Sequence, residues 1–126
     1  MTGADLIAAG TGESEGLFIN SNGGAVEVTS NTVSSGSVID IESQKGASLT
    51  VESLNAAGKL DVESKEGSIN VSSEANGNTG GLQVAAESGS VTLRGLNVDS
   101  STDIDVQAKD SISVTGGSLK NNDGSN

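Results

Sequence analysis

The segment "KLDVESKEGSINV" (residues 59–71) contains two short runs of alternating apolar and polar residues, separated by a charged corner that includes a glycine. Leu60 and Val62 are the apolar residues of the first run, and Ile69 and Val71 are those of the second. Successive side chains of a β-strand point to opposite faces, so each run predicts a strand with one apolar face. The segment is therefore predicted to form two short strands joined by a tight corner.

The same arrangement recurs along the whole chain. Pairs of apolar residues two positions apart form two interleaved series, and a third series consists of single apolar residues. The first series is Leu17/Ile19, Ile39/Ile41, Leu60/Val62, Leu82/Val84 and Ile104/Val106. The second is Val26/Val28, Leu49/Val51, Ile69/Val71, Val91/Leu93 and Ile112/Val114, and the third is Val33, Leu54, Ala75 and Leu96. Because like members lie about 22 residues apart, the sequence predicts a repeat with three short strands.

Small residues follow the apolar pairs at a constant distance. Two positions after each pair of the first series stand Ser21, Ser43, Ser64, Ala86 and Ala108, and after the second stand Ser30, Ser53, Ser73, Gly95 and Gly116. Residues i, i+2 and i+4 of a strand share one face, so these small residues are predicted to point inward where the chain turns. Glycines that precede the second strand suit such corners.

These patterns predict an all-β fold, a single-chain parallel β-solenoid with about 22 residues per coil and about five coils. Stacked coils would bury the apolar faces at a spacing of about 4.8 Å. A narrow core also explains why the chain has 33% hydrophobic residues, one Phe and no Trp, Tyr or Pro. We expect one domain over residues 1–126, with a partial first coil at 1–16, repeats at about 17–38, 39–59, 60–81, 82–103 and 104–119, and a flexible tail at 120–126.

Charge and composition exclude several classes of function. The chain carries 17 acidic and 6 basic residues, a formal net charge of −11, which disfavours nucleic acids and anionic membranes as partners. It has no Cys and no His, so Ser-His-Asp and Cys-His catalytic sites are excluded. No phosphate-binding loop motif occurs. The sequence therefore predicts a protein that is not an enzyme and that has no catalytic residues, cofactor or assigned metal ligands.

The segment "LQVAAESGSVTLRGLNVDSSTDIDVQAKDSISV" (residues 82–114) resembles the repeats of filamentous haemagglutinin-type proteins, which include secreted adhesins and contact-dependent inhibition toxins. The resemblance implies a right-handed parallel β-helix that serves as an extracellular shaft. The likeness extends over about residues 17–119 and consists of the recurring pattern of short strands and corners, not of individual motifs. The chain shows neither the secretion domain nor the toxin domain of that family, and "MTGADLIAAG" does not read as a signal peptide. We expect a secreted or cell-surface location.

One outward-facing group of residues invites a functional interpretation. Stacking of the first-series strands would place Asp40 beside Asp61 and Glu42 beside Glu63, and we call these four residues the acidic patch. Two coils could share a Ca²⁺ ion there, or the patch could be a solvated acidic face. The absence of a calcium-repeat motif favours the solvated face. The outward residues of the second series include several Thr and Ser, but Glu and Arg interrupt them, which argues against ice binding.

The two ends of the chain suggest a partner. "GADLIAAG" (residues 3–10) resembles "VESLNAAG" (residues 51–58), so the chain begins in the second or third strand of a coil and ends, after Leu119, at nearly the same phase. Neither end shows a capping helix, and uncapped strands invite homotypic end-to-end stacking. The main hypothesis is a rigid, non-enzymatic rod of a bacterial adhesin or fibre. The alternatives are a complete subunit that assembles head to tail into a filament, and a glycan- or cation-binding module.

Overall fold

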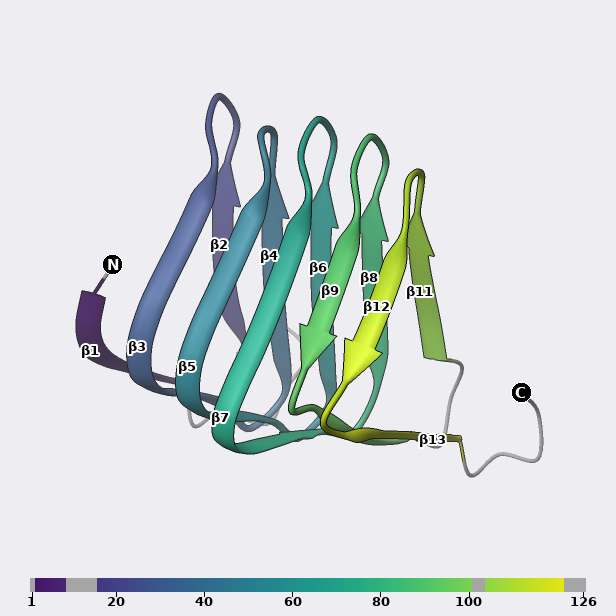
Figure 1. Cartoon of the computed structure of the whole chain (residues 1–126). Coiled ribbons are helices and arrows are strands. Elements are labelled where there is room, and N and C mark those ends of the chain that lie inside the picture. The colour runs from purple at the N-terminus through teal and green to yellow at the C-terminus, as the bar shows by residue number, and fades with distance from the viewer. Residues whose placement is uncertain (1, 9–15, 101–103, 122–126) are drawn as a thin grey trace.

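The protein is an all-β parallel solenoid, as the sequence predicts (Figure 1). The computed structural model describes residues 2–8, 16–100 and 104–121. Within them the strands are β1 (Thr2–Ala8), β2 (Leu17–Ser21), β3 (Val26–Ser35), β4 (Val38–Ser43), β5 (Ala47–Ala56), β6 (Lys59–Ser64), β7 (Ile69–Thr79), β8 (Leu82–Ala86), β9 (Val91–Arg94), β10 (Asn97–Ser100), β11 (Ile104–Ala108), β12 (Ile112–Thr115) and β13 (Ser118–Asn121). No described segment is a helix long and apolar enough to cross a membrane.

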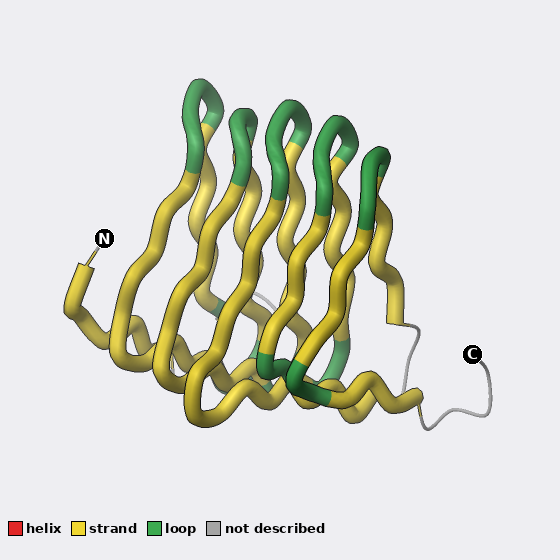
Figure 2. The backbone as a smooth tube through the Cα atoms, viewed as in Figure 1, coloured by secondary structure: helices red, strands yellow, loops and turns green. Residues whose placement is uncertain are grey.

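The strands form two sheets that enclose the core from three sides. Side 1 is the five-stranded sheet, in the order β11-β8-β6-β4-β2. Side 2 consists of the first halves of β3, β5 and β7 together with β9 and β12, and side 3 consists of β1, the second halves of β3, β5 and β7, β10 and β13. Sides 2 and 3 belong to one sheet that bends around a corner (Figure 1). A row of loops joins side 1 to side 2 (Figure 2).

The corner between sides 2 and 3 differs along the solenoid. In the first coils the chain passes through it within one long strand, so β3, β5 and β7 have 10 or 11 residues each. In the later coils Gly95 and Gly116 stand at the corner with φ angles of +73° and +67°, which L-residues with a side chain rarely adopt. They divide the path into β9 and β10 and into β12 and β13. The three separate strands per coil that the sequence predicts therefore occur only in these later coils.

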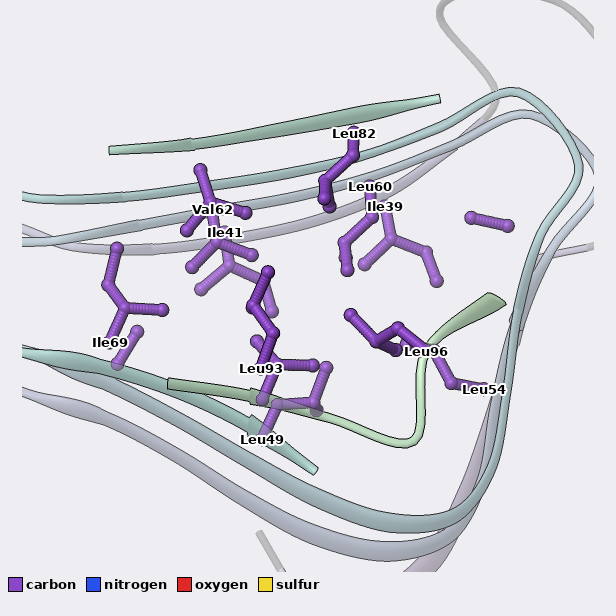
Figure 3. Packing of buried hydrophobic residues seen from close by; sticks show 14 of the residues in the cluster. Ile39, Ile41, Leu49, Leu54, Leu60, Val62, Ile69, Leu82, Leu93 and Leu96 are labelled. Atoms are coloured by element: carbon purple, nitrogen blue, oxygen red, sulfur yellow. The ribbon is translucent and has the colours of Figure 1, made fainter. Parts of the chain in front are cut away.

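Side 1 has the register that the first apolar series predicts. Leu17 pairs with Ile39, Ile39 with Leu60 and Leu60 with Leu82, and Leu82 pairs with Ile104. Ile39, Leu60 and Leu82 are at most 1% exposed and lie one behind another in the core (Figure 3). The predicted inward column of small residues also forms, and Ser43, Ser64 and Ala86 in it are buried. The buried Ser43 hydroxyl accepts the backbone N–H of Gly46 at 3.1 Å.

On side 2 the prediction is wrong for one coil. Val28, not Val26, lies opposite Leu49, and Ser30 lies opposite Val51. The inward corner residue of this coil is therefore Val51 instead of Ser53. The first paired residues of successive coils on side 2 are Val26, Ala47, Ile69, Val91 and Ile112. Their spacing of 21 or 22 residues matches that of side 1. Equal spacing follows because every coil must advance by one strand separation on all sides.

On side 3 the predicted third series is wrong at Ala75. Leu54 pairs with Gly77, after an irregularity in the pairing of β5 with β7 that adds residues to β7. A Cβ atom on Gly77 would lie 3.1 Å from Leu96 Cδ2 and 3.0 Å from Ser73 Cβ, so neighbouring side chains occupy the space that a larger residue would need. Leu54 and Leu96, on the coils before and after Gly77, are both buried in the core.

The first described strand, β1, begins beside side 2, with Thr2 opposite Thr29, and continues on side 3, where the last strand, β13, also lies. β1 pairs with β3 so that Leu6 lies opposite Val33 and Ala8 opposite Ser35, which confirms the phase predicted from the likeness of residues 3–10 to residues 51–58. β13 pairs with β10, with Leu119 opposite Val98. β13 also includes two residues that the sequence assigns to a flexible tail, and residues 9–15, 101–103 and 122–126 lie outside the described residues.

Candidate functional site

The acidic patch forms on side 1 as the sequence predicts. Asp40 on β4 pairs with Asp61 on β6, and Glu42 pairs with Glu63. The patch is limited to two coils because Phe18 and Asn20 occupy the equivalent positions of β2, and Gln83 and Ala85 those of β8. Like charges on neighbouring strands repel each other, so the patch costs stability unless other groups compensate it.

Lys59 provides part of the compensation. Its Nζ lies 3.7 Å from Asp61 Oδ2 and donates a hydrogen bond of 3.3 Å to Gln83 Oε1 on the next coil. The Asp61 side chain is only 17% exposed, and its Oδ1 atom is buried without a hydrogen-bond partner in the described structure. One oxygen of this carboxylate is thus paired with a cation, while the other is shielded from solvent.

The electrostatics of the patch favour protonation of three carboxyl groups. Burial is the largest cause that raises the pKa of Asp40, followed by the charges of Asp61 and Glu42. The pKa of Asp61 is also raised, because burial outweighs the attraction of the Lys59 ammonium. Burial and then the surrounding carboxylates raise the pKa of Glu63. Ionisation of these three carboxyl groups therefore costs more free energy in the folded protein than in the unfolded chain.

Phe18 covers one end of the patch. It pairs with Asp40 from the neighbouring strand β2, and together with Ser37, Val38 and Lys59 it lines a shallow pocket around the two aspartates. Its ring is 53% exposed, in a chain with no other aromatic residue. The ring therefore borders Asp40, whose pKa is raised chiefly by burial.

A second shallow pocket surrounds the glutamates of the patch. Asn20, Lys65 and Glu87 line it together with Glu42 and Glu63. Asn20 Nδ2 donates a hydrogen bond of 3.0 Å to Glu42 Oε2, which satisfies one carboxylate oxygen from the preceding coil. The glutamates thus have a solvated, partly paired environment that differs from the buried environment of Asp61.

Two further lysines close to the patch residues in the sequence, Lys45 and Lys65, lie in different surroundings. Lys45 Nζ lies 2.7 Å from Glu66 Oε2, and this hydrogen bond lowers the pKa of Glu66. Both side chains are about half exposed, in the row of loops between sides 1 and 2. Lys45 therefore compensates a corner charge, and Lys65 contributes to the pocket around the glutamates.

The patch does not have the geometry of a metal site. Within the described ranges, no three or more Asp, Glu, His or Cys side chains are grouped so that they could hold a metal ion. Outward residues of one strand lie about 6.6 Å apart, because each residue advances the strand by about 3.3 Å. Ca²⁺ needs six to eight oxygen ligands at about 2.3–2.6 Å. The arrangement favours the solvated acidic face over the shared cation site.

The outward face of side 2 is less charged than the sequence suggests. The corrected register aligns Thr29 with Thr50 and Ser72, and it removes Glu52 from this face. Glu27 on β3 and Arg94 on β9 remain on this face. The face therefore presents mainly hydroxyl groups.

Side 3 carries a column of amides that the sequence analysis missed. Asn55, Asn78 and Asn97 are exposed and occupy one register column, and Ser118 extends it by donating a hydrogen bond of 3.3 Å to Asn97 Oδ1. A groove beside this column is also lined by Asp99 and other residues of the same side. The column is hidden in the sequence because the irregular pairing of β7 makes the intervals between its members unequal.

No known protein family, curated protein or solved structure matches the chain. The fold by itself places the chain in a class, the parallel β-solenoid repeat proteins. The filamentous haemagglutinin assignment gains no support beyond the β-helix repeat architecture itself.

Proposed function

We propose that this protein is a non-enzymatic structural rod of the adhesin or fibre type, used outside the cell or at its surface. The observation that carries the proposal is the unbroken stacking on side 1, where all five strands pair in one register with short connections. Such a fold converts chain length into axial length at about 4.8 Å per coil. A spacer needs this property, and a binding or catalytic domain does not.

Further features of the molecule support a spacer role. The core continues from coil to coil as columns of Ile, Leu and Val, so neighbouring coils stabilise each other along the whole rod. The net charge of −11 opposes sideways association of neighbouring rods. The resemblance of residues 82–114 to the repeats of adhesin shafts supports the extracellular location.

A length measurement tests the rod. Asn22 and Asp110 are exposed residues of the loop row at opposite ends, so Asn22→Cys and Asp110→Cys provide two unique sites for spin labels. One, two or three extra copies of residues 60–81 are inserted after Gly81, in phase with the existing coils. We expect the distance between the labels to grow by about 4.8 Å for each copy.

The control insertion has the same composition but a scrambled order, which destroys the apolar alternation. It should broaden the distance distribution without the regular increment. An in-phase series in which the distance fails to grow linearly would contradict the rod, because the added coils would then not stack.

A further inference from the structure

The last coil exposes the end of the apolar core. Ile112, Val114 and Leu119 are 48%, 40% and 39% exposed, although they pair with the buried Val91, Leu93 and Val98 of the preceding coil. They occupy inward positions and are exposed because no described coil covers them.

The first coil presents a matching surface at the other end. Leu17 and Ile19 of β2 are only partly buried, and they form the outer edge of side 1. If the 22-residue register continued from one molecule to the next, Ile104 would lie opposite Leu17 and Val106 opposite Ile19 of a second copy. Apolar residues would then meet apolar residues, as they do at every internal step of side 1.

The outward residues of this junction are electrostatically compatible. Asp105 would meet Phe18, and Gln107 would meet Asn20, so no two carboxylates would oppose each other on side 1. The internal step from β4 to β6 pairs Asp40 with Asp61, and the molecule tolerates it. On charge grounds the contact between molecules is less unfavourable than this contact within one molecule.

Side 3 prevents this contact in the folded chain. Sides 1 and 2 contain five strands each, but side 3 contains six: β1, the second halves of β3, β5 and β7, β10 and β13. When β2 of a second copy stacks on β11, the β1 strand of that copy must occupy the level at which β13 already lies. Contact on all three sides therefore requires that one of these two strands leaves.

β1 is the strand with the less regular ladder, although it pairs six residues with β3 and β13 pairs four with β10. Its pairing with β3 is interrupted by two register shifts within the first four residues. β13 pairs with β10 without interruption, and Ser118 adds a backbone hydrogen bond of 2.9 Å to Leu96 O and a side-chain bond to Asn97.

We propose that β1 is a displaceable plug, and that a second copy of this chain docks its first coil on the last coil after its own β1 has been released. The contact is heterologous, so repeated docking would build a filament along the solenoid axis. This inference rests on the proposed rod function, to which it adds the partner and the element that controls assembly.

The test releases β1 in the full chain. In Leu6→Pro/Ile7→Pro two adjacent backbone N–H groups of β1 are lost, so the strand cannot keep its ladder with β3. Sedimentation velocity and negative-stain electron microscopy should show a single-chain species for the unchanged protein. The variant should give a concentration-dependent series of multiples and unbranched fibres.

A second pair of variants shows where the contact lies. Adding Ile112→Lys/Val114→Lys to the released chain places charges on the open end of the core and should abolish assembly. The matched control, Ser113→Lys/Thr115→Lys, adds the same charges to the outward face of the same strand and should leave assembly in place. If both lysine pairs act alike, the proposed contact is wrong.

Other outcomes also decide the proposal. Assembly of the unchanged chain to the same extent as the Leu6→Pro/Ile7→Pro variant would refute the plug, and a folded variant that stays single would refute the docking. If that variant does not fold, Leu119→Pro/Lys120→Pro removes β13 from the same level and must assemble. The label-distance series on single molecules is independent of stacking, so a failure of the rod would be recognised separately.

Discussion

Sides 1 and 3 are built from the same repeats, yet side 1 is regular and side 3 is not. Side 1 keeps one register through five strands, whereas side 3 contains the glycine at position 77, the irregular pairing of β7, the strand breaks next to Gly95 and Gly116, and most of the first and last described strands, β1 and β13. Two apolar residues per strand fill the core from side 1, and a slip by one residue would expose both. On side 3, β5 also buries two apolar residues, Leu54 and Ala56, but Ser35, Gly77 and Thr79 take the place of large apolar residues on β3 and β7, so the constraint is weaker. How much irregularity a side of the solenoid tolerates thus depends on how many large apolar side chains its strands place in the core.

The largest expected effect is a cavity beneath side 1. Leu60 is fully buried between Ile39 and Leu82, so Leu60→Ala should lower the free energy of unfolding by about 2–5 kcal/mol. Urea denaturation followed by circular dichroism measures the change. Leu119→Ala on side 3 removes the same atoms from a side chain that is 39% exposed, and the loss should be clearly smaller. Equal losses would contradict the dominant role of side 1.

A medium effect on stability is expected at Gly77 on side 3. In Gly77→Ala the new methyl group would lie 2.6 Å from the carbonyl oxygen of Gly95 and 3.1 Å from Leu96 Cδ2, so we expect a loss of about 1–3 kcal/mol. Gly23→Ala is the control, because nothing lies within 4 Å of its added methyl group. The two melting temperatures should differ by several degrees. Similar values would mean that side 3 adapts to overpacking.

The smallest effect concerns the acidic patch and its pH dependence. The folded protein raises the pKa of Asp40, Asp61 and Glu63, so it binds more protons than the unfolded chain between the usual carboxyl pKa of about 4 and the raised values. The contribution of these groups to stability is therefore fully present below that window and is lost as the pH rises through it.

Asp40→Asn removes one repelling charge and should stabilise the protein at neutral pH by about 0.2–1 kcal/mol. Denaturation midpoints of the variant and the unchanged chain should converge toward pH 3. Asp105→Asn, on the same face but opposite Gln83, serves as the control and should show less gain. A variant that loses stability at neutral pH would show that Asp40 has a favourable partner.

The regular part of the molecule could be predicted from the sequence, and the irregular part could not. Alternating apolar pairs define side 1 and the outward position of the acidic patch. They do not define the register of β5 on side 2, because Ala47, Leu49 and Val51 alternate over three positions and the sequence offers two ways to choose a pair. A glycine such as Gly77 gives no apolar signal, so the irregularity of β7 and the amide column were hidden.

The properties of the acidic patch also exceed what the sequence can show. The pairing of Asp40 with Asp61 follows from the repeat, but the orphaned Oδ1 of Asp61 depends on which way the Lys59 side chain turns. The Lys59 ammonium lies near one oxygen of Asp61 and also donates a hydrogen bond to Gln83 on the next coil. Such choices are made by side-chain torsions and local solvation, which no periodic pattern encodes.

The direction of the backbone hydrogen bonds has a mechanical consequence. In stacked parallel strands these bonds run along the solenoid axis, so a force that pulls the two ends apart loads the outermost ladder before the inner ones. The coils would peel off singly, and each would release about 22 residues, or about 75 Å of extended chain. Under tension the rod would act as an extensible tether that gives way in steps and limits the force transmitted between its ends.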